Sequence, residues 1–148
     1  IRFEWQFSLG AIIALIHDVI ITIGFFSILE FEINLSIVAA VLTIVGYSMN
    51  DTVVIFDRVR ENLKKYSSKS INEISNLSIN ETLSRTIITS LTTLLALLSI
   101  FFFGGKILHG FSFAMILGVI FGTYSSIFIA NPILIKLKVN QKSVLKGE

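Results

Sequence analysis

The chain has no cysteine, one proline and few charged residues, since Asp, Glu, Lys and Arg make up 15% of its 148 residues, against roughly 25% in a typical soluble domain. Without cysteine it has no disulfide framework, no cysteine-ligated zinc and no thiol nucleophile. The two histidines, His17 and His109, lie far apart and match no metal-binding spacing. We therefore expect neither a metal site nor a cofactor.

The apolar residues, 53% of the chain, are concentrated in four runs at residues 7–28, 35–56, 85–103 and 111–135. Each run is long enough to cross about 30 Å of hydrocarbon as a helix. Together they contain three charged residues, Asp18, Asp51 and Arg85. This partition predicts an all-α membrane protein, a polytopic bundle of four transmembrane helices, with the third helix spanning from about residue 82. A loop at 57–81 and a basic tail at 136–148 complete the predicted domain.

The basic residues outside these runs lie almost entirely on one side of the predicted bundle. The first residues, the loop 57–81 and the tail 136–148 hold ten Lys and Arg, whereas the two opposite connections hold Lys106 alone. By the positive-inside rule, both ends and the central loop are cytoplasmic. Because the first residue is Ile1, we expect the chain to be a fragment. We expect no cleavable signal peptide, since the run 7–28 is too long and contains an acidic residue.

The connections between the runs also carry structural signals. Residues 29–34 and 104–110 are short enough for tight helical hairpins, with Gly104 and Gly105 ending the third helix. Ser-Ile-Asn-Glu occurs at 70–73 and again at 78–81, and each copy is a capping-box pattern. These predict a short cytoplasmic helix from about residue 71 and a separate helix for the third span from about residue 79.

Two helix faces have a recognisable periodicity. Apolar residues at helical spacing predict that the second helix continues past the membrane surface as an amphipathic extension, or as a helix end anchored by basic residues to anionic lipid; these residues are Phe56, Val59, Leu63 and Tyr66. On the fourth run, Gly118 and Gly122 form a GxxxG pattern with Ser125 and Ser126 one turn on. Such a surface favours close approach of another helix.

Charged groups inside the spans are costly in hydrocarbon and are therefore candidate functional residues. Asp51 lies five residues before the cytoplasmic end of its run, about 7 Å into the membrane at 1.5 Å per residue. Arg85 enters at a similar depth on the next, antiparallel helix. The two residues are predicted to form a neutralising pair, which is either a switchable proton site or a static ion pair that locks two helices together.

Polar side chains accompany these charges. Tyr47 and Asn50 share a helix face with Asp51, and Thr89 shares one with Arg85. The two faces either enclose a narrow wet path or serve helix packing. In the first run, Asp18 is protonated, paired with His17 or another chain, or part of a secondary relay, with packing or partner contact as the alternative.

Sequence motifs for enzymatic chemistry are lacking. The stretch GYSMN at 46–50 misses the second glycine of GxSxG, and neither a phosphate-binding loop nor a zinc-protease motif occurs. We therefore expect that the chain is not an enzyme.

One segment is distinctive enough to indicate a family. Residues 46–62, GYSMNDTVVIFDRVREN, resemble the signature of the SecF family of protein-export membrane subunits. RFEW at 2–5, HDV at 17–19, LSRT at 83–86, TSLTTL at 89–94 and the stretch 118–126 are similar to that family in the same order. The resemblance implies that the four spans correspond to the third to sixth of six helices. It also implies that Asp51 is the proton-relay aspartate and Arg85 its partner, while the first helix, the periplasmic domain and most of the second helix are missing.

The resemblance further implies a function and a set of partners. Members of this family belong to the resistance-nodulation-division-like permeases and use the proton gradient in late preprotein translocation across the bacterial cytoplasmic (inner) membrane. The implied partners are a SecD-like subunit, the SecYEG translocon, YajC, YidC and the translocating preprotein, within the lipid bilayer and without nucleic acid. Two alternatives remain: a non-conducting structural scaffold for a SecD-like partner, and a fragment of a small-solute permease.

Overall fold

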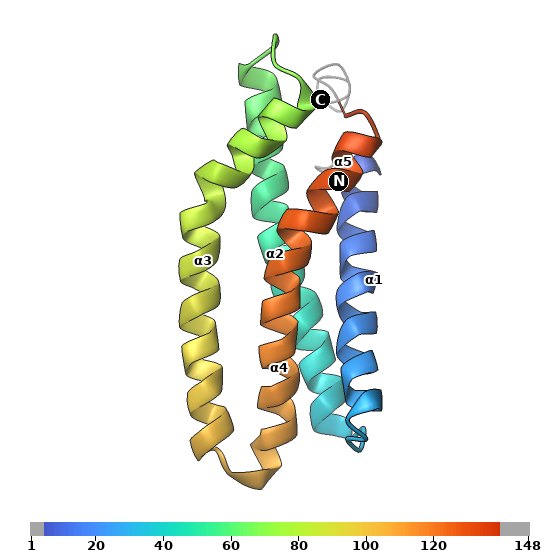
Figure 1. Cartoon of the computed structure of the whole chain (residues 1–148), viewed down its shortest axis with the longest axis vertical. Helices are drawn as coiled ribbons and strands as arrows, with labels where there is room; N and C mark the ends of the chain where they lie inside the picture. Colours follow the sequence, from blue (N-terminus) through green and yellow to red (C-terminus); the bar gives the residue numbers. More distant parts are fainter. Residues whose placement is uncertain (1–4, 140–148) are drawn as a thin grey trace.

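The computed structural model describes residues 5–139, which form an antiparallel bundle of long helices. The long helices are α1 (Trp5–Ile28), α2 (Leu35–Lys65), α3 (Ile71–Phe103) and α4 (Gly105–Ser125). A π-helical turn, η1 (Ser126–Ala130), and a short helix, α5 (Asn131–Lys136), follow α4. Figure 1 shows that the α1–α2 and α3–α4 connections lie at one end of the bundle and the α2–α3 connection at the other.

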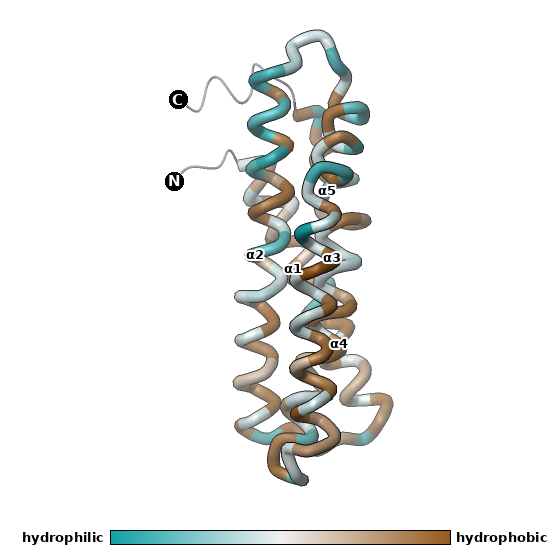
Figure 2. The backbone as a smooth tube through the Cα atoms, turned by 90° about the vertical axis from the view of Figure 1, so that its left-hand side faces the viewer, coloured by the Kyte–Doolittle hydropathy of each residue, from teal (hydrophilic) through white to brown (hydrophobic). Residues whose placement is uncertain are grey.

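Four of the helical segments are long and apolar enough to cross a membrane, with α4, η1 and α5 together making the fourth. Figure 2 shows hydrophobic residues along most of the bundle and hydrophilic ones gathered at the end that carries the α2–α3 connection. Backbone groups in hydrocarbon have to be satisfied within the segment, which helices achieve. The predicted fold class, an all-α multi-pass membrane bundle, is confirmed.

Close packing of α4 against α2 explains the GxxxG pattern. A Cβ atom added at Gly118 would lie 2.2 Å from Cγ1 of Ile44, and one added at Gly122 would lie 3.4 Å from Cβ of Ser48. Real Cβ atoms essentially never lie within 3.0 Å of a neighbouring heavy atom, so a Cβ at Gly118 would force Ile44 or the two helices to shift. The prediction of a close helix contact at these glycines is confirmed, and α2 is the helix that makes it.

The second helix continues beyond the apolar run, as its amphipathic pattern predicts. Helix α2 ends only at Lys65, and Phe56, Val59 and Leu63 in its last turns are buried. They pack in one apolar cluster with Ile74 of α3. The extension is therefore held by the protein's own third helix.

The prediction of two separate helices after the loop is wrong, because α3 is continuous from Ile71 to Phe103. The first capping box is formed: Ser70 Oγ accepts from the Glu73 amide at 3.4 Å, and the Ser70 amide donates to Glu73 Oε2 at 3.0 Å. The second is not formed, because the Ser78 hydroxyl donates to the Ile74 carbonyl at 2.7 Å as an interior helix residue. Glu81, the last residue of that second motif, accepts hydrogen bonds from Arg58 and Asn62 of α2.

The fourth span differs from its prediction at its start and in its interior, whereas its end at Lys136 lies one residue from the predicted end at 135. Helix α4 starts at Gly105, in the left-handed region at φ +75°, instead of near residue 111, so the α3–α4 connection is the single residue Gly104. The helix leaves the α form at Ser126–Ala130, and Pro132 just after this turn has no amide to donate to the Phe128 carbonyl, as an α-helix would require. Figure 1 shows α5 leaning away from the axis of α4 after this turn.

Candidate functional site

Asp51 lies on the buried face of α2, in the middle of the bundle. Asp51 is 5% exposed. Among the residues that the structure describes, no hydrogen-bond donor reaches its Oδ2 atom. Thr52 beside it bonds Ser126 of η1 at 2.9 Å. Asp51 is therefore enclosed by the chain and retains one carboxyl oxygen that no protein donor occupies.

Arg85 is near Asp51 without touching it. Its charge acts electrostatically on Asp51, but within residues 5–139 no ion pair of 4.0 Å or less joins the two. The reason lies in the rotation of α3, which turns Thr82 and Thr86 into the bundle and leaves Arg85 exposed beside them. The expected direct pair is thus absent from this structure, and the relay role of both residues stays a prediction.

The other polar residues of the two predicted faces separate into two groups. Tyr47 donates to Ser90 of α3 at 3.4 Å, and Ser90 bonds Thr123 of α4 at 2.6 Å. Asn50 is exposed and Thr89 only half-buried on the isolated chain. The structure therefore connects Tyr47 to the bundle interior, whereas Asn50 and Arg85 face whatever surrounds this chain.

Asp18 joins three helices. Its residue is fully buried, and Oδ2 accepts hydrogen bonds from Ser48 of α2 and, at 2.8 Å, from Ser125 of α4. Its Oδ1 lies 3.2 Å from Nδ1 of His17, the pairing that the sequence analysis considered. Thr22 donates to the Asp18 carbonyl at 2.9 Å. Asp18 thus occupies a packing position, at a junction of α1, α2 and α4.

Several residues of this interior were missed as site candidates. Ser48, Thr52 and Ser90 were not singled out, and Ser125 and Ser126 were noted only as small residues next to the GxxxG pattern. A signal existed for Ser48, since it lies one turn before Asp51 on the same helix face. Serine and threonine in membrane helices also bond their own backbone, so their sequence positions do not reveal which of them reach another helix.

A second polar cluster lies outside the spans, between the extension of α2 and the first turns of α3. Arg58 Nε donates to Glu81 at 2.7 Å, and Arg58 Nη1 donates to Glu61 at 2.8 Å. Asn62 donates to Glu81 at 2.8 Å and to Ser78 at 3.0 Å. The hydrogen bonds from Arg58 and Asn62 lower the pKa of Glu81 to about 2, while the hydrogen bonds to Glu81 and Glu61 raise the pKa of Arg58.

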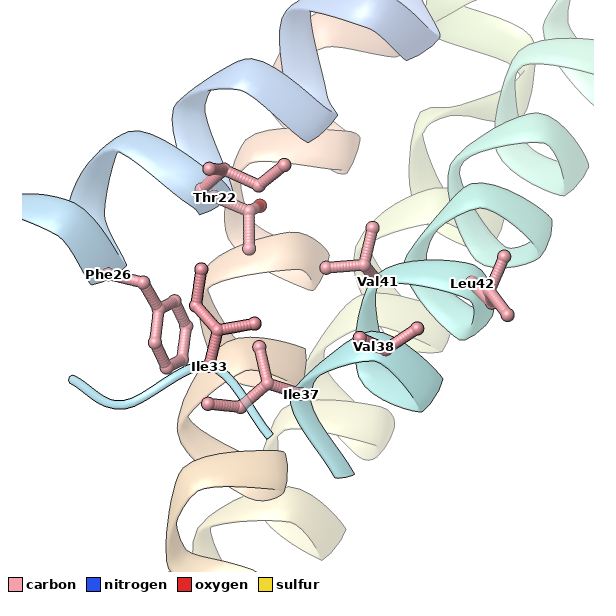
Figure 3. Close-up of a pocket in the computed structure, with 8 residues that line it drawn as sticks. Thr22, Phe26, Ile33, Ile37, Val38, Val41 and Leu42 are labelled. Atoms are coloured by element: carbon pink, nitrogen blue, oxygen red, sulfur yellow. The ribbon is translucent and has the colours of Figure 1, made fainter. Parts of the chain in front are cut away.

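A pocket between α1 and the start of α2 is apolar. It has a volume of about 170 Å³ and is lined by Thr22, Ile23, Phe26, Ile33, Ile37, Val38, Val41 and Leu42. Figure 3 shows Ile37 and Val41 of α2, together with Ile33 of the connection, on the side of Phe26 and Thr22 of α1. The hydroxyl of Thr22 is already engaged by the Asp18 carbonyl. This pocket therefore offers no group for proton or ion chemistry.

The sequence matches the family described as "Protein export membrane protein SecD/SecF, C-terminal" over residues 1–140. The chain is 58% identical to the protein translocase subunit SecF of Rickettsia prowazekii (strain Madrid E), covering 100% of this chain and 49% of that protein. It is 60% identical to the protein translocase subunit SecF of Rhodothermus marinus, covering 93% and 47%. The chain thus spans about half the length of these curated relatives.

A solved structure shares the fold. The crystal structure of SecDF, described as a translocon-associated membrane protein from Thermus thermophilus, superposes with a TM-score of 0.89 at 47% identity. The match covers 93% of this chain and 19% of that longer chain. The arrangement of α1 to α5 is therefore similar to one part of a larger export protein.

Proposed function

This chain belongs to the family of protein-export membrane proteins SecD/SecF and corresponds to its C-terminal part, and we propose that it acts in a SecF subunit that draws on the proton-motive force. In this proposal the subunit assists late translocation of preproteins across the bacterial inner membrane. The chain contributes the helices in which a proton is bound and released. Asp51 is the group that binds it.

The observation that carries this proposal is the state of the Asp51 carboxyl group. It lies within a membrane-spanning helix, is nearly inaccessible and has an oxygen without a donor among the described residues. An ionised group there is costly, so its presence calls for a function or a partner. Because no ion pair within the described part of the chain immobilises it, the carboxyl group has an oxygen that can take up and release a proton.

Arg85 supports the proposal from outside the core. An exposed arginine on a membrane-spanning helix is unfavourable against lipid, and the same holds for a polar side chain such as Asn50. We infer that a SecD-like subunit covers this face of α2 and α3. The superposition with one part of the larger SecDF chain supports such an arrangement.

The mechanism follows from electrostatics. Protonation of Asp51 removes its attraction to Arg85, so the relative position of α2 and α3 changes before the proton leaves on the other side. A proton that moves down 100 mV releases about 2.3 kcal/mol. This shifts a two-state equilibrium by about 50-fold, at about 1.4 kcal/mol per factor of ten, which is enough to drive a change in helix packing.

The proposal also includes a topology and further partners. Both ends of the chain and the α2–α3 connection lie in the cytoplasm, as the basic residues indicate. The SecYEG translocon, YajC, YidC and the translocating preprotein are the other partners. Support for the translocon comes from the description of the Thermus thermophilus relative as translocon-associated.

The test is pulse-chase export of a secreted precursor in cells whose only SecF is the full-length subunit carrying Asp51→Asn. We expect export to slow to the level of cells without SecF while SecD still co-purifies. Asp57→Asn, an exposed aspartate on the same helix, serves as the matched control and leaves export normal. Normal export with Asp51→Asn would show that this part of the bundle is a scaffold.

A further inference from the structure

The three-helix junction around Asp18 buries a carboxyl group far from both ends of the bundle. Asp18 lies in the middle of α1 and is completely inaccessible. Serine hydroxyls from α2 and α4 donate to one of its oxygens. Burying a carboxylate is costly unless a charge or a proton balances it, even when hydrogen bonds satisfy its oxygens.

No basic group of the neighbouring helices supplies that balance. Among residues 5–139, no Lys or Arg lies within 4.0 Å of Asp18, and the groups that reach it from α2 and α4 are the neutral hydroxyls of Ser48 and Ser125. Asp51, one turn from Ser48 on α2, is itself acidic. The titratable group in contact with Asp18 is His17, whose Nδ1 lies 3.2 Å from Oδ1.

His17 connects this buried acid to the surface of the chain. Its side chain is 30% exposed, whereas that of Asp18 is 0% exposed. One ring nitrogen faces Oδ1 of Asp18, and an imidazole can bind a proton on one nitrogen while releasing one from the other. The pair therefore places a partly exposed imidazole, which can accept a proton, against an enclosed carboxyl group.

We propose that Asp18 is a second proton-binding carboxyl group, loaded through His17. A proton binds Nε2 of His17, and the resulting imidazolium transfers its Nδ1 proton to Oδ1 of Asp18. The imidazole is then neutral again and the carboxylate has become a neutral carboxylic acid, so the pair has gained one proton and lost one negative charge. The site does not depend on the role proposed for Asp51.

Proton binding at Asp18 changes the hydrogen bonds that link α1 to α2 and α4. The Ser125 hydroxyl lies 2.8 Å from Asp18 Oδ2 and 3.2 Å from the Gly122 carbonyl, so it has two acceptors within reach. A charged acceptor forms a stronger hydrogen bond than a neutral one. Loss of the charge therefore favours the Gly122 carbonyl and weakens the link from α1 to α4, directly before the π-helical turn.

Infrared difference spectroscopy tests this on the full-length subunit with its partner, over the pH range in which the complex translocates. In wild type we expect a protonated-carboxyl band that Asp18→Asn removes and Asp51→Asn retains. Asparagine keeps an oxygen for the two serine hydroxyls, so the junction is preserved. The proposal is overturned if every protonated-carboxyl band of wild type persists unchanged in Asp18→Asn. A band that Asp18→Asn removes and Asp51→Asn retains separates this site from the relay proposed for Asp51.

Two further variants keep the test independent of whether Asp18→Asn folds. Ser48→Ala removes the donor that has no second acceptor within reach among the described residues, so the band should move to the frequency of a more weakly hydrogen-bonded acid. His17→Gln removes the loading group, so the band should form at least ten times more slowly after a pH jump. An unshifted band in Ser48→Ala, or an unchanged rate in His17→Gln, contradicts the assignment.

Discussion

At the scale of single residues, two buried aspartates of the same bundle are held in different ways. Asp18 has donors from two other helices, whereas Asp51 retains an oxygen without a donor in the described part of the chain. The sequence indicated that both need an explanation, because charged groups are rare in membrane spans. It did not indicate which of the two carboxyl groups would be hydrogen-bonded, because the donors are serines from helices distant in the sequence.

Gly118 shows how far a single position constrains the helix packing. Gly118→Ala places a methyl group on Ile44, so α2 and α4 have to separate, and we expect a loss of about 1–3 kcal/mol in stability. Gly24→Ala is the control, because nothing lies within 4 Å of a Cβ at that position. Thermal unfolding in detergent measures both. Equal unfolding temperatures for the two variants would contradict the packing described here.

At the scale of elements, the helices were predictable as spans, and some ends were too: α1 ends at Ile28, α2 begins at Leu35 and α3 ends at Phe103, as the apolar runs do. The end of α2, the continuity of α3 and the start of α4 were not predicted. The lengths of the apolar runs predicted four membrane-spanning helices, because the thickness of the hydrocarbon layer sets a minimum length for such a helix. The ends depend on local chemistry that the sequence leaves ambiguous: two identical Ser-Ile-Asn-Glu motifs differ in outcome because Asn62 and Arg58 of α2 engage Ser78 and Glu81.

The capping box formed by Ser70 and Glu73 should stabilise the start of α3. Ser70→Ala removes the acceptor for the Glu73 amide, at an expected cost of about 0.5–2 kcal/mol. Hydrogen exchange of the amides in residues 71–74 should accelerate accordingly. Ser78→Ala, at the equivalent position of the second motif, should leave exchange at 79–82 unchanged, because Ser78 does not cap a helix. Faster exchange there would indicate a real helix start.

The cluster of Arg58 and Glu81 predicts a dependence of stability on pH. The pKa of Glu81 falls from 4.5 to about 2 on folding, so the folded state binds fewer protons than the unfolded state between these values. Its stabilising contribution is complete above about pH 4.5 and is lost as the pH falls towards 2. The unfolding temperature of wild type should exceed that of Glu81→Gln near neutral pH, and this difference should vanish near pH 2.

The matched control for this prediction is Glu32→Gln, an exposed residue at the opposite end of the bundle. It should match wild type at every pH. A Glu81→Gln variant as stable as wild type near neutral pH would show that the contacts of Glu81 contribute nothing to folding.

At the scale of the whole molecule, the arrangement of four spans predicts which connections face the cytoplasm. The absence of cysteine from the 148 residues allows single cysteines to be introduced in turn at Lys69, in the α2–α3 connection, and Lys106, at the α3–α4 turn. A membrane-impermeant maleimide added to whole cells with a permeable outer membrane should label Lys106→Cys and spare Lys69→Cys. The reverse pattern would invert the proposed topology.

For the whole bundle, counting residues from the ends of the spans predicted Asp51 and Arg85 at similar depth, and among residues 5–139 no ion pair joins them. The sequence could not predict that Arg85 would be exposed while Asp51 is buried, because this depends on how α3 is rotated against α2. The central claim is that Asp51 binds the proton that drives export.

The most direct measurement of that claim is proton flux in inverted membrane vesicles that contain the full-length subunit and its SecD-like partner, with Asp51→Asn compared with Asp57→Asn. We predict that Asp51→Asn abolishes the flux attributable to the complex, while Asp57→Asn matches wild type and both variants assemble equally. Equal flux in wild type and Asp51→Asn would contradict the account and leave Asp51 with a structural role.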